Sequence, residues 1–306
     1  MLSNMKTSVA VLLFQFLSIV VFCAPSSVTK AGFYLPDSLQ EVTLKYRSVM
    51  NLVILPVTIN DSIHVNLVLD TGCRNLVLFG KRFSKLFDLN SGKKIQFSGL
   101  GNGSPVVGDL SLGNNVSIHA VTGANIPVVI VPNQNIFDTH AKVDGVIGYD
   151  ILIKFEVELN LANQLITFRP ASTAELSSDY KRVAIRIEES RPIINSVVFF
   201  YGREGQACDM MIDTGSCLGL LLKTTDVSKY PVGVWTEALG RGLNGKIEGT
   251  RTMTEKIMLE DLELKKVSAG IIYSPWHNYA SVGMEIMKEY SIVLNYCKAY
   301  PGFKKV

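Results

Sequence analysis

The chain has 306 residues, which is enough for one large domain or two modest ones. Hydrophobic residues make up 47% and charged residues 19%, so a disordered chain is excluded and a sizeable buried core is expected. The formal net charge is only +3 at pH 7, and charge therefore gives no reason to expect a nucleic acid or an anionic membrane as a partner.

The first residues differ in kind from the rest of the chain. Lys6 is followed by an apolar run over residues 9–23 that only Gln15 and Ser18 interrupt. This length is typical of the core of a secretory signal and is short for a membrane span. We expect a signal peptide over residues 1–24 and hence a secreted or periplasmic protein. A lipidated Cys23 and a retained membrane anchor stand as alternatives.

Two segments of the chain share an ordered series of landmarks. Each has an apolar strand that ends in Asp-Thr-Gly, with the aspartates at Asp70 and Asp213, and each triplet precedes a second apolar run. Glycine-rich stretches, alternating strands, a short apolar segment ending in glycine and a closing strand then recur in the same order. The paired landmarks are residues 76–79 and 218–222, 99–103 and 240–245, 110–121 and 257–267, 143–152 and 279–287, and 155–160 and 291–295. This series predicts an internal duplication.

Short β-branched runs between Gly, Pro, Asn and Asp turns predict a mostly β protein. Helices should be few and short, near Asp150, near Glu285 and over residues 83–86. Residues 170–181 have little apolar content and are expected to join the halves. The predicted organisation is an N-terminal lobe over residues 25–172 and a C-terminal lobe over residues 173–306.

The two aspartates carry the predicted chemistry. A carboxylate at the end of a buried strand is costly unless it has partners or a function. Two carboxylates from equivalent halves can meet at a two-fold axis, where they cannot both ionise and therefore share a proton. One can then act as base toward a water while the other donates a proton to a peptide carbonyl. We expect Asp70 and Asp213 to be catalytic.

These motifs resemble those of the pepsin-like and retropepsin-like aspartic proteases. The resemblance rests on both Asp-Thr-Gly triplets, on the glycine-rich hairpins, and on Val146-Ile-Gly148 and Ser281-Val-Gly283, in which Ser281 departs from the family pattern. It implies an all-β fold of two pseudo-symmetric, barrel-like lobes with a cleft between them. It also implies a monomer that takes a peptide or protein substrate and needs no cofactor, metal or nucleic acid.

The resemblance also assigns residues around the two aspartates. Residues expected to support the dyad are Thr71, Gly72, Cys73, Thr214, Gly215 and Ser216. Residues expected to bind substrate from flap-like hairpins are Gly99, Leu100, Gly101, Gly240, Arg241 and Gly242. Each threonine can form hydrogen bonds across the axis, and each glycine lets the backbone turn tightly. Hairpins rich in glycine can cover a cleft and offer bare backbone to an extended peptide.

The same residues allow three other interpretations. Residues 240–245 match G-x-G-x-x-G, but no helix-forming segment follows, so a dinucleotide site is disfavoured. Gly215-Ser-Cys-Leu-Gly219 matches a nucleophile elbow, which indicates as an alternative a hydrolase with Cys217 as the nucleophile. A peptide-binding protein that keeps the fold without turnover is the third reading. The four histidines lack metal-ligand spacing, and Cys73, Cys208, Cys217 and Cys297 leave disulfides or free thiols open.

A charge pair is expected beside the first triplet. Retroviral proteases carry an aspartate where this chain has Arg74, and that aspartate pairs with an arginine just after the glycine of the short apolar segment. The corresponding stretch here is Gly148-Tyr-Asp150, so the positive and negative charges of the pair are exchanged between the two positions. The sequence therefore predicts that Arg74 pairs with Asp150 and ties the catalytic turn to the short helix that begins there.

Overall fold

The structure is a computed structural model. It describes residues 31–306 except for residues 90–91, 133–136, 138–140, 232–235 and 275–278. The predicted signal peptide at residues 1–24 lies outside the described residues. Within the described part, no helix has the length and apolar character needed to span a membrane.

The first large sheet is built from the first half of the chain. Its strands are β1 (Gly32–Tyr34), β3 (Arg47–Val49), β4 (Leu52–Ile59), β5 (Ile63–Leu69), β6 (Leu76–Phe79), β7 (Lys94–Phe97), β8 (Val106–Ile118), β9 (Val121–Val131) and β10 (Gly145–Ile147). They lie in the order β1-β9-β6-β10-β5-β4-β8-β7, and β3 pairs with β4. A further pairing of β8 with β9 curls the sheet back on itself.

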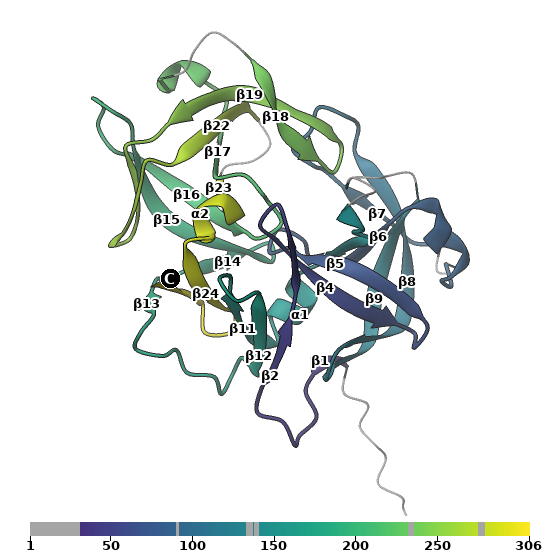
Figure 1. The fold of residues 1–306 in the computed structure, drawn as a ribbon. Helices are drawn as coiled ribbons and strands as arrows, with labels where there is room; N and C mark the ends of the chain where they lie inside the picture. Colours follow the sequence, from purple (N-terminus) through teal and green to yellow (C-terminus); the bar gives the residue numbers. More distant parts are fainter. Residues whose placement is uncertain (1–30, 90–91, 133–136, 138–140, 232–235, 275–278) are drawn as a thin grey trace, which may run out of the picture.

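The second large sheet is built from the second half. Its strands are β14 (Arg186–Glu188), β15 (Arg191–Phe199), β16 (Gln206–Asp213), β17 (Leu220–Thr224), β18 (Glu237–Gly242), β19 (Gly245–Met253), β20 (Lys256–Leu259), β21 (Leu262–Lys265), β22 (Ser268–Tyr273) and β23 (Ala280–Gly283). They lie in the order β18-β19-β22-β17-β23-β16-β15-β20-β21, and β14 pairs with β15. Figure 1 shows this sheet in green and yellow-green and the first sheet in purple, blue and teal.

The centres of the two sheets follow one plan. The order β9-β6-β10-β5-β4 in the first sheet matches β22-β17-β23-β16-β15 in the second. The strand directions agree as well. β5–β10 and β16–β23 are parallel, β6–β10 and β17–β23 are antiparallel, and β6–β9 and β17–β22 are parallel. The repeated strand order agrees with the repeated landmarks of the sequence.

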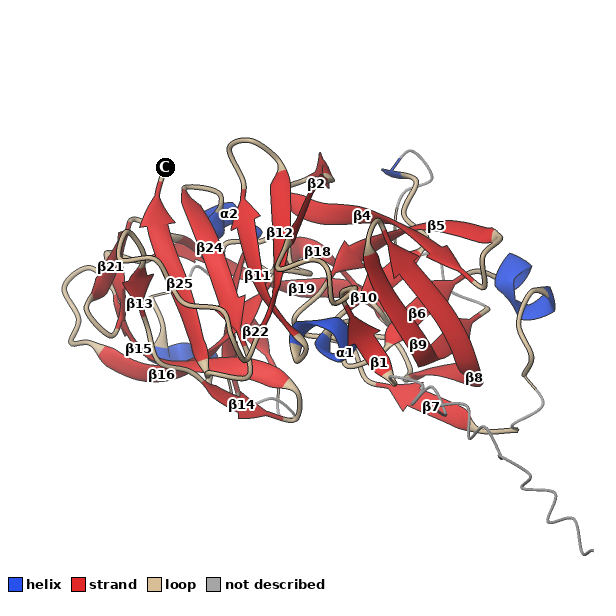
Figure 2. Cartoon of the chain, turned by 90° about the horizontal axis from the view of Figure 1, so that it is seen from below, coloured by secondary structure: helices blue, strands red, loops and turns tan. Residues whose placement is uncertain are grey.

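A third sheet draws on both halves of the chain. It contains β2 (Val42–Lys45), β11 (Phe155–Asn160), β12 (Leu165–Pro170), β13 (Lys181–Arg182), β24 (Tyr290–Asn295) and β25 (Tyr300–Lys305) in the order β13-β25-β24-β11-β12-β2. The closing strands of the halves, β11 and β24, pair directly at its centre. Figure 2 shows this sheet lying between the two large ones. Buried Glu156 accepts hydrogen bonds from the Tyr300 hydroxyl and from Asn295 Nδ2 across the junction.

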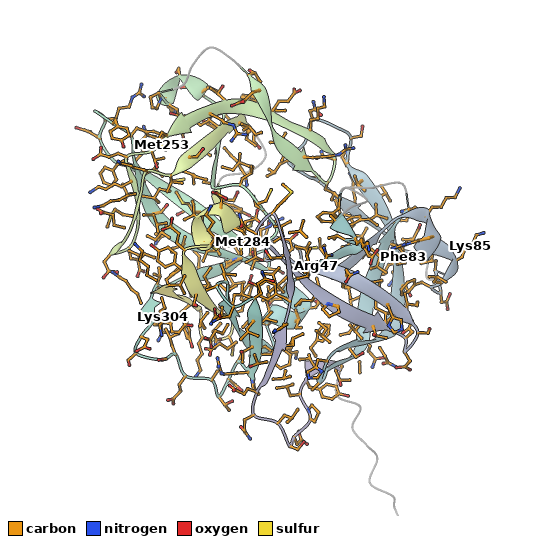
Figure 3. The ribbon with its side chains drawn as sticks, in the orientation of Figure 1. Arg47, Phe83, Lys85, Met253, Met284 and Lys304 are labelled. Carbon is orange, nitrogen blue, oxygen red and sulfur yellow. The ribbon has the colours of Figure 1, made fainter. Side chains whose placement is uncertain are left out.

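Helices are short, as the sequence predicts. The structure has α1 (Tyr149–Leu152) and α2 (Met284–Met287), together with 3-10 turns at Lys81–Lys85 and Val227–Lys229. Val, Ile and Leu dominate the buried core, because β-branched and aliphatic side chains suit strands packed on both faces. Figure 3 shows side chains filling the interior around Met284, which is fully buried. The predicted all-β class is confirmed, and it is compatible with the acid-protease fold.

Candidate active site

The two aspartates sit at equivalent places in the two large sheets. Asp70 follows β5, Asp213 ends β16, and each strand runs parallel to a short apolar strand, β10 or β23. The backbone N–H of Asp70 donates to the Ile147 carbonyl at 2.8 Å, and Asp213 pairs with Gly283. Each Asp-Thr-Gly turn is thereby fixed to the segment Val146-Ile-Gly148 or Ser281-Val-Gly283.

The two carboxyl groups lie close together. A Cβ added to Gly72 would lie 3.1 Å from Asp70 Oδ1 and 3.7 Å from Asp213 Oδ1. A Cβ added to Gly215 would lie only 2.4 Å from Asp70 Cγ, so this position requires glycine for close approach. The Gly72 N–H donates to Asp70 Oδ1 at 2.7 Å, and the Gly215 N–H donates to Asp213 Oδ1 at 3.1 Å.

Beneath the carboxyls, the two threonines form crossed hydrogen bonds. The Thr71 N–H donates to Thr214 Oγ1 at 3.1 Å, and the Thr214 N–H donates to Thr71 Oγ1 at 2.9 Å. Each hydroxyl also donates to a backbone carbonyl of the opposite half, Thr71 to Ile212 at 2.6 Å and Thr214 to Leu69 at 2.7 Å. Both threonines are fully buried. These four bonds hold the two triplets in a fixed, symmetric relation.

Burial dominates the electrostatics of the pair. It raises the pKa of Asp70 above its usual range, although the Gly72 N–H and the charge of Arg191 oppose the shift. Burial and the neighbouring charge of Asp70 raise the pKa of Asp213 to about 7, against the opposing charges of Lys223 and Arg191. A buried pair of this kind retains a shared proton at pH values where an ordinary aspartate has lost it. Sequence reasoning did not single out Lys223 or Arg191.

The residues after each triplet anchor the two Asp-Thr-Gly turns. The Cys73 carbonyl accepts from the Tyr149 N–H at 2.9 Å, and the Ser216 carbonyl accepts from the Met284 N–H at 2.8 Å. The four cysteines that the structure describes are free thiols. Burial raises the pKa of both Cys73 and Cys217, and nearby carboxylates raise each further. A protonated thiol is a poor nucleophile, which weakens the reading of Cys217 as the attacking group.

Both glycine-rich segments lie at hairpin tips, and the two tips touch. The first hairpin joins β7 to β8 and the second joins β18 to β19. Asn244 lies at the second tip, and both the oxygen and the nitrogen of its side-chain amide form hydrogen bonds with the first tip. Its Oδ1 accepts from the Gly101 N–H at 2.7 Å, and its Nδ2 donates to the Gly103 carbonyl at 2.9 Å.

Backbone bonds complete this contact between the tips. The Gly103 N–H donates to the Asn244 carbonyl at 2.8 Å, and the Asn102 N–H donates to the Lys246 carbonyl at 3.1 Å. A side chain at Gly103 would lie 2.1 Å from that Asn244 carbonyl, so the tip must be glycine. Leu100 packs against Leu221, Leu239, Ile247 and Ile272 of the second half. Gly240 and Arg241 are exposed, and Gly242 and Gly99 are half-buried near the contact.

The predicted direct pair between Arg74 and Asp150 is not formed in the described structure. Arg74 is exposed, so its guanidinium stays hydrated, and Asp150 Oδ2 is buried without a hydrogen-bond partner. Burial raises the pKa of Asp150 to about 6, while the charge of Arg74 and a hydrogen bond from Asn75 lower it. Arg74 therefore acts on Asp150 electrostatically and at a distance.

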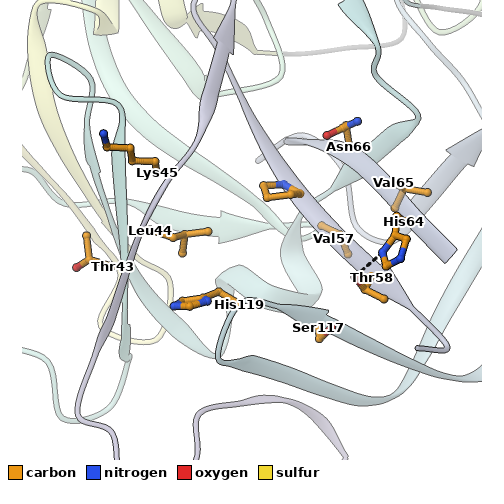
Figure 4. Close-up of a pocket in the computed structure, with 11 residues that line it drawn as sticks. Thr43, Leu44, Lys45, Val57, Thr58, His64, Val65, Asn66, Ser117 and His119 are labelled. Carbon is orange, nitrogen blue, oxygen red and sulfur yellow. Dashed lines mark hydrogen bonds between the residues drawn. The ribbon is translucent and has the colours of Figure 1, made fainter. Parts of the chain in front are cut away.

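A separate cavity lies away from the two aspartates. It has a volume of about 600 Å³ and lies between β2, the β4–β5 hairpin and the end of β8 (Figure 4). His64 and His119 line it, and His64 Nδ1 is 3.0 Å from Thr58 Oγ1. Within the part of the chain that the structure describes, no group of three or more His, Cys, Asp or Glu side chains is placed to hold a metal ion.

Comparison with known families agrees with the geometry of the site. The family described as aspartyl protease matches residues 55–151, a segment that contains the first triplet and the first hairpin and ends within α1. The match supports the resemblance to pepsin-like and retropepsin-like aspartyl proteases and so supports a peptidase as the class of protein. A comparison with curated proteins finds no match.

The crossed threonine bonds generate a first prediction. Thr71→Ala removes the acceptor of the Thr214 N–H and the donor to the Ile212 carbonyl. Each of these two buried groups left without a partner costs roughly 1–3 kcal/mol, so chemical denaturation should show a loss of about 2–6 kcal/mol in the free energy of unfolding. Thr71→Ser keeps the hydroxyl and is the matched control. Equal unfolding free energies for the two variants would show that the bonds do not stabilise the fold.

The contact between hairpin tips generates a second prediction. Asn244→Ala removes two hydrogen bonds, so the amide of Gly101 should exchange with solvent roughly fivefold faster, as expected for a loss of about 1 kcal/mol. Asn102→Ala is the control, because Asn102 contributes its backbone N–H to the contact. Hydrogen exchange measured by NMR or mass spectrometry decides the matter. Unchanged exchange at Gly101 in Asn244→Ala would contradict an Asn244 clasp.

Proposed function

We propose that the chain is a secreted aspartic endopeptidase whose two lobes, residues 25–172 and 173–306, each supply one catalytic aspartate. The observation that carries the proposal is the pair of half-buried carboxyls set against each other by crossed bonds between the fully buried Thr71 and Thr214. A purely structural role does not account for this arrangement, because an apolar pair would fill the same space without the cost of burying charge.

The mechanism follows from the shared proton. A water between the two carboxyls loses a proton to the ionised aspartate as its oxygen attacks the carbonyl carbon of the scissile peptide bond. The protonated aspartate gives its proton to the carbonyl oxygen, which becomes a hydroxyl of the tetrahedral intermediate. When that intermediate collapses, the C–N bond breaks, a proton moves to the leaving amine, and the pair again holds one proton.

The hairpin tips provide the cover for this reaction. An extended substrate needs main-chain hydrogen bonds, and the glycine-rich tips offer N–H and C=O groups without side chains in the way. In the structure the tips bind each other through Asn244, so a substrate must part them before it reaches the carboxyls. Parting two hairpins is a small cost, because the bonds lost to each other are replaced by bonds to the peptide.

Point variants separate this proposal from its two competitors. Asp213→Asn leaves no carboxylate partner for Asp70 and should lower kcat/KM on a peptide library by about 10³-fold or more, in line with general acid–base catalysis. Cys217→Ala should leave cleavage unchanged. Loss of activity in Cys217→Ala with retention in Asp213→Asn would establish a cysteine hydrolase instead. Peptide binding without cleavage by the unaltered chain would establish a binding protein that keeps the fold.

A further inference from the structure

Arg191 stands beside Asp213 at the end of the second sheet. In the β15–β16 ladder Ile193 lies opposite Met211, and both strands continue to Arg191 and Asp213, which therefore end the ladder as neighbours. The guanidinium is half-buried. Its Nη1 donates to the Tyr279 hydroxyl at 3.1 Å and lies 2.9 Å from Glu189 Oε2. The Glu189 side chain is 80% exposed, so its pairing with Arg191 offsets little of the positive charge.

Lys223 is a second cation beside Tyr279, the residue that Arg191 contacts. In the β17–β23 ladder Leu221 lies opposite Ser281, so Lys223 lies opposite Tyr279, two residues further out. Its Nζ is 5.6 Å from the centre of the Tyr279 ring. Among the described residues, no carboxylate lies within ion-pair distance of this ammonium group. Burial lowers the pKa of Lys223 to about 8, and the charge of Arg191 lowers it further while that of Asp213 raises it.

Both cations lie on the face of the sheet that the hairpins cover. Residues paired across neighbouring strands share a face, and alternate residues along a strand return to it. Lys223 therefore shares a face with Leu221, which packs against Leu239 of the second hairpin and Leu100 of the first. Arg191 shares a face with Asp213. β15, β16, β23 and β17 are consecutive neighbours in the sheet, as Figure 1 shows.

The first half has no such charges at the equivalent positions. In the β4–β5 ladder, where Ile54 lies opposite Val68, the residue beside Asp70 is Leu52, which is buried. The counterpart of Lys223 is Phe79, which ends β6 as a buried ring against Phe137. The floor below the hairpins is therefore apolar on the side of the first half and cationic on the side of the second.

We propose that Arg191 and Lys223 form a subsite for an acidic substrate side chain, so that the protease selects peptides with Asp or Glu on the side of the scissile bond that lies against the second half. This inference rests on the proposed peptidase function. Lys223 makes no ion pair and Arg191 pairs only with the exposed Glu189, so both keep charge to offer beyond their longer-range attraction to Asp213, and a carboxylate placed beside them is attracted to both. A neutral side chain gains no such attraction, which is the basis of discrimination.

The test uses peptides that differ only in Glu or Gln at one position, with that position scanned along the cleavable sequence. The unaltered chain should cleave the Glu peptide with a kcat/KM roughly 10–100-fold higher at one position. Lys223→Met should abolish this ratio, and Lys223→Arg, which keeps the charge, should retain it. Lys256→Met is the matched control. Lys256 lies on β20, and its Nζ also lies over an aromatic ring, 5.0 Å from the ring centre of Phe199.

Binding of non-cleavable hydroxyethylene analogues of the same Glu and Gln peptides separates two kinds of failure. Cleavage with equal kcat/KM for the two peptides, or a ratio unchanged in Lys223→Met, overturns the subsite and leaves the peptidase function standing. Absence of any cleavage together with tighter binding of the Glu analogue, lost in Lys223→Met, supports the subsite and removes the peptidase function. Equal binding of both analogues by the unaltered chain overturns the subsite in either case.

Discussion

Two half-buried carboxyl groups held close to each other are the constraint on which the rest of the structure depends. Burial and mutual repulsion raise the pKa of Asp213 to about 7, so the folded protein holds a proton that an unfolded chain releases near pH 4. Because proton binding is linked to folding, stability falls over the pH range in which the unfolded chain has released this proton and the folded protein still holds it. This contribution to stability is fully present at acidic pH and is lost as the pH rises through about 7. The threonine bonds and the third sheet hold the carboxyls together against this cost.

That rigid support ends at the hairpins. Below the carboxyls, Thr71 and Thr214 are fully buried and every hydroxyl has a backbone partner in the opposite half. The tips are joined by a few hydrogen bonds around Asn244, and Leu100 of the first tip packs against a small apolar cluster of the second half. The triplets are therefore held by fully buried bonds, whereas the tips are joined at positions that are only partly buried, and the proposed function requires these tips to part.

The sequence predicted the features that depend on local pattern. Each of these features is encoded within about ten residues: Asp-Thr-Gly after an apolar strand, the glycine-rich hairpins, and the helices near Asp150 and Glu285. The duplication presents each feature twice and so makes it easier to recognise. Features that depend on side chains meeting across strands were missed. Arg191, Lys223 and Tyr279 come from three separate segments, and no spacing links them. The Arg74–Asp150 pair failed as a direct contact because an exposed arginine gains little by leaving water.

The shared proton can be observed directly by NMR of the protein labelled with ¹³C at the aspartate carboxyls. We expect one carboxyl of the pair to stay protonated at pH 6 and to release its proton as the pH rises through about 7, well above the ordinary aspartate value of about 4. In Asp70→Asn the pKa of Asp213 should fall, because the neighbouring charge is gone. Two independent titrations near 4, with both Asp70 and Asp213 ionised at pH 6, would contradict a dyad that shares one proton.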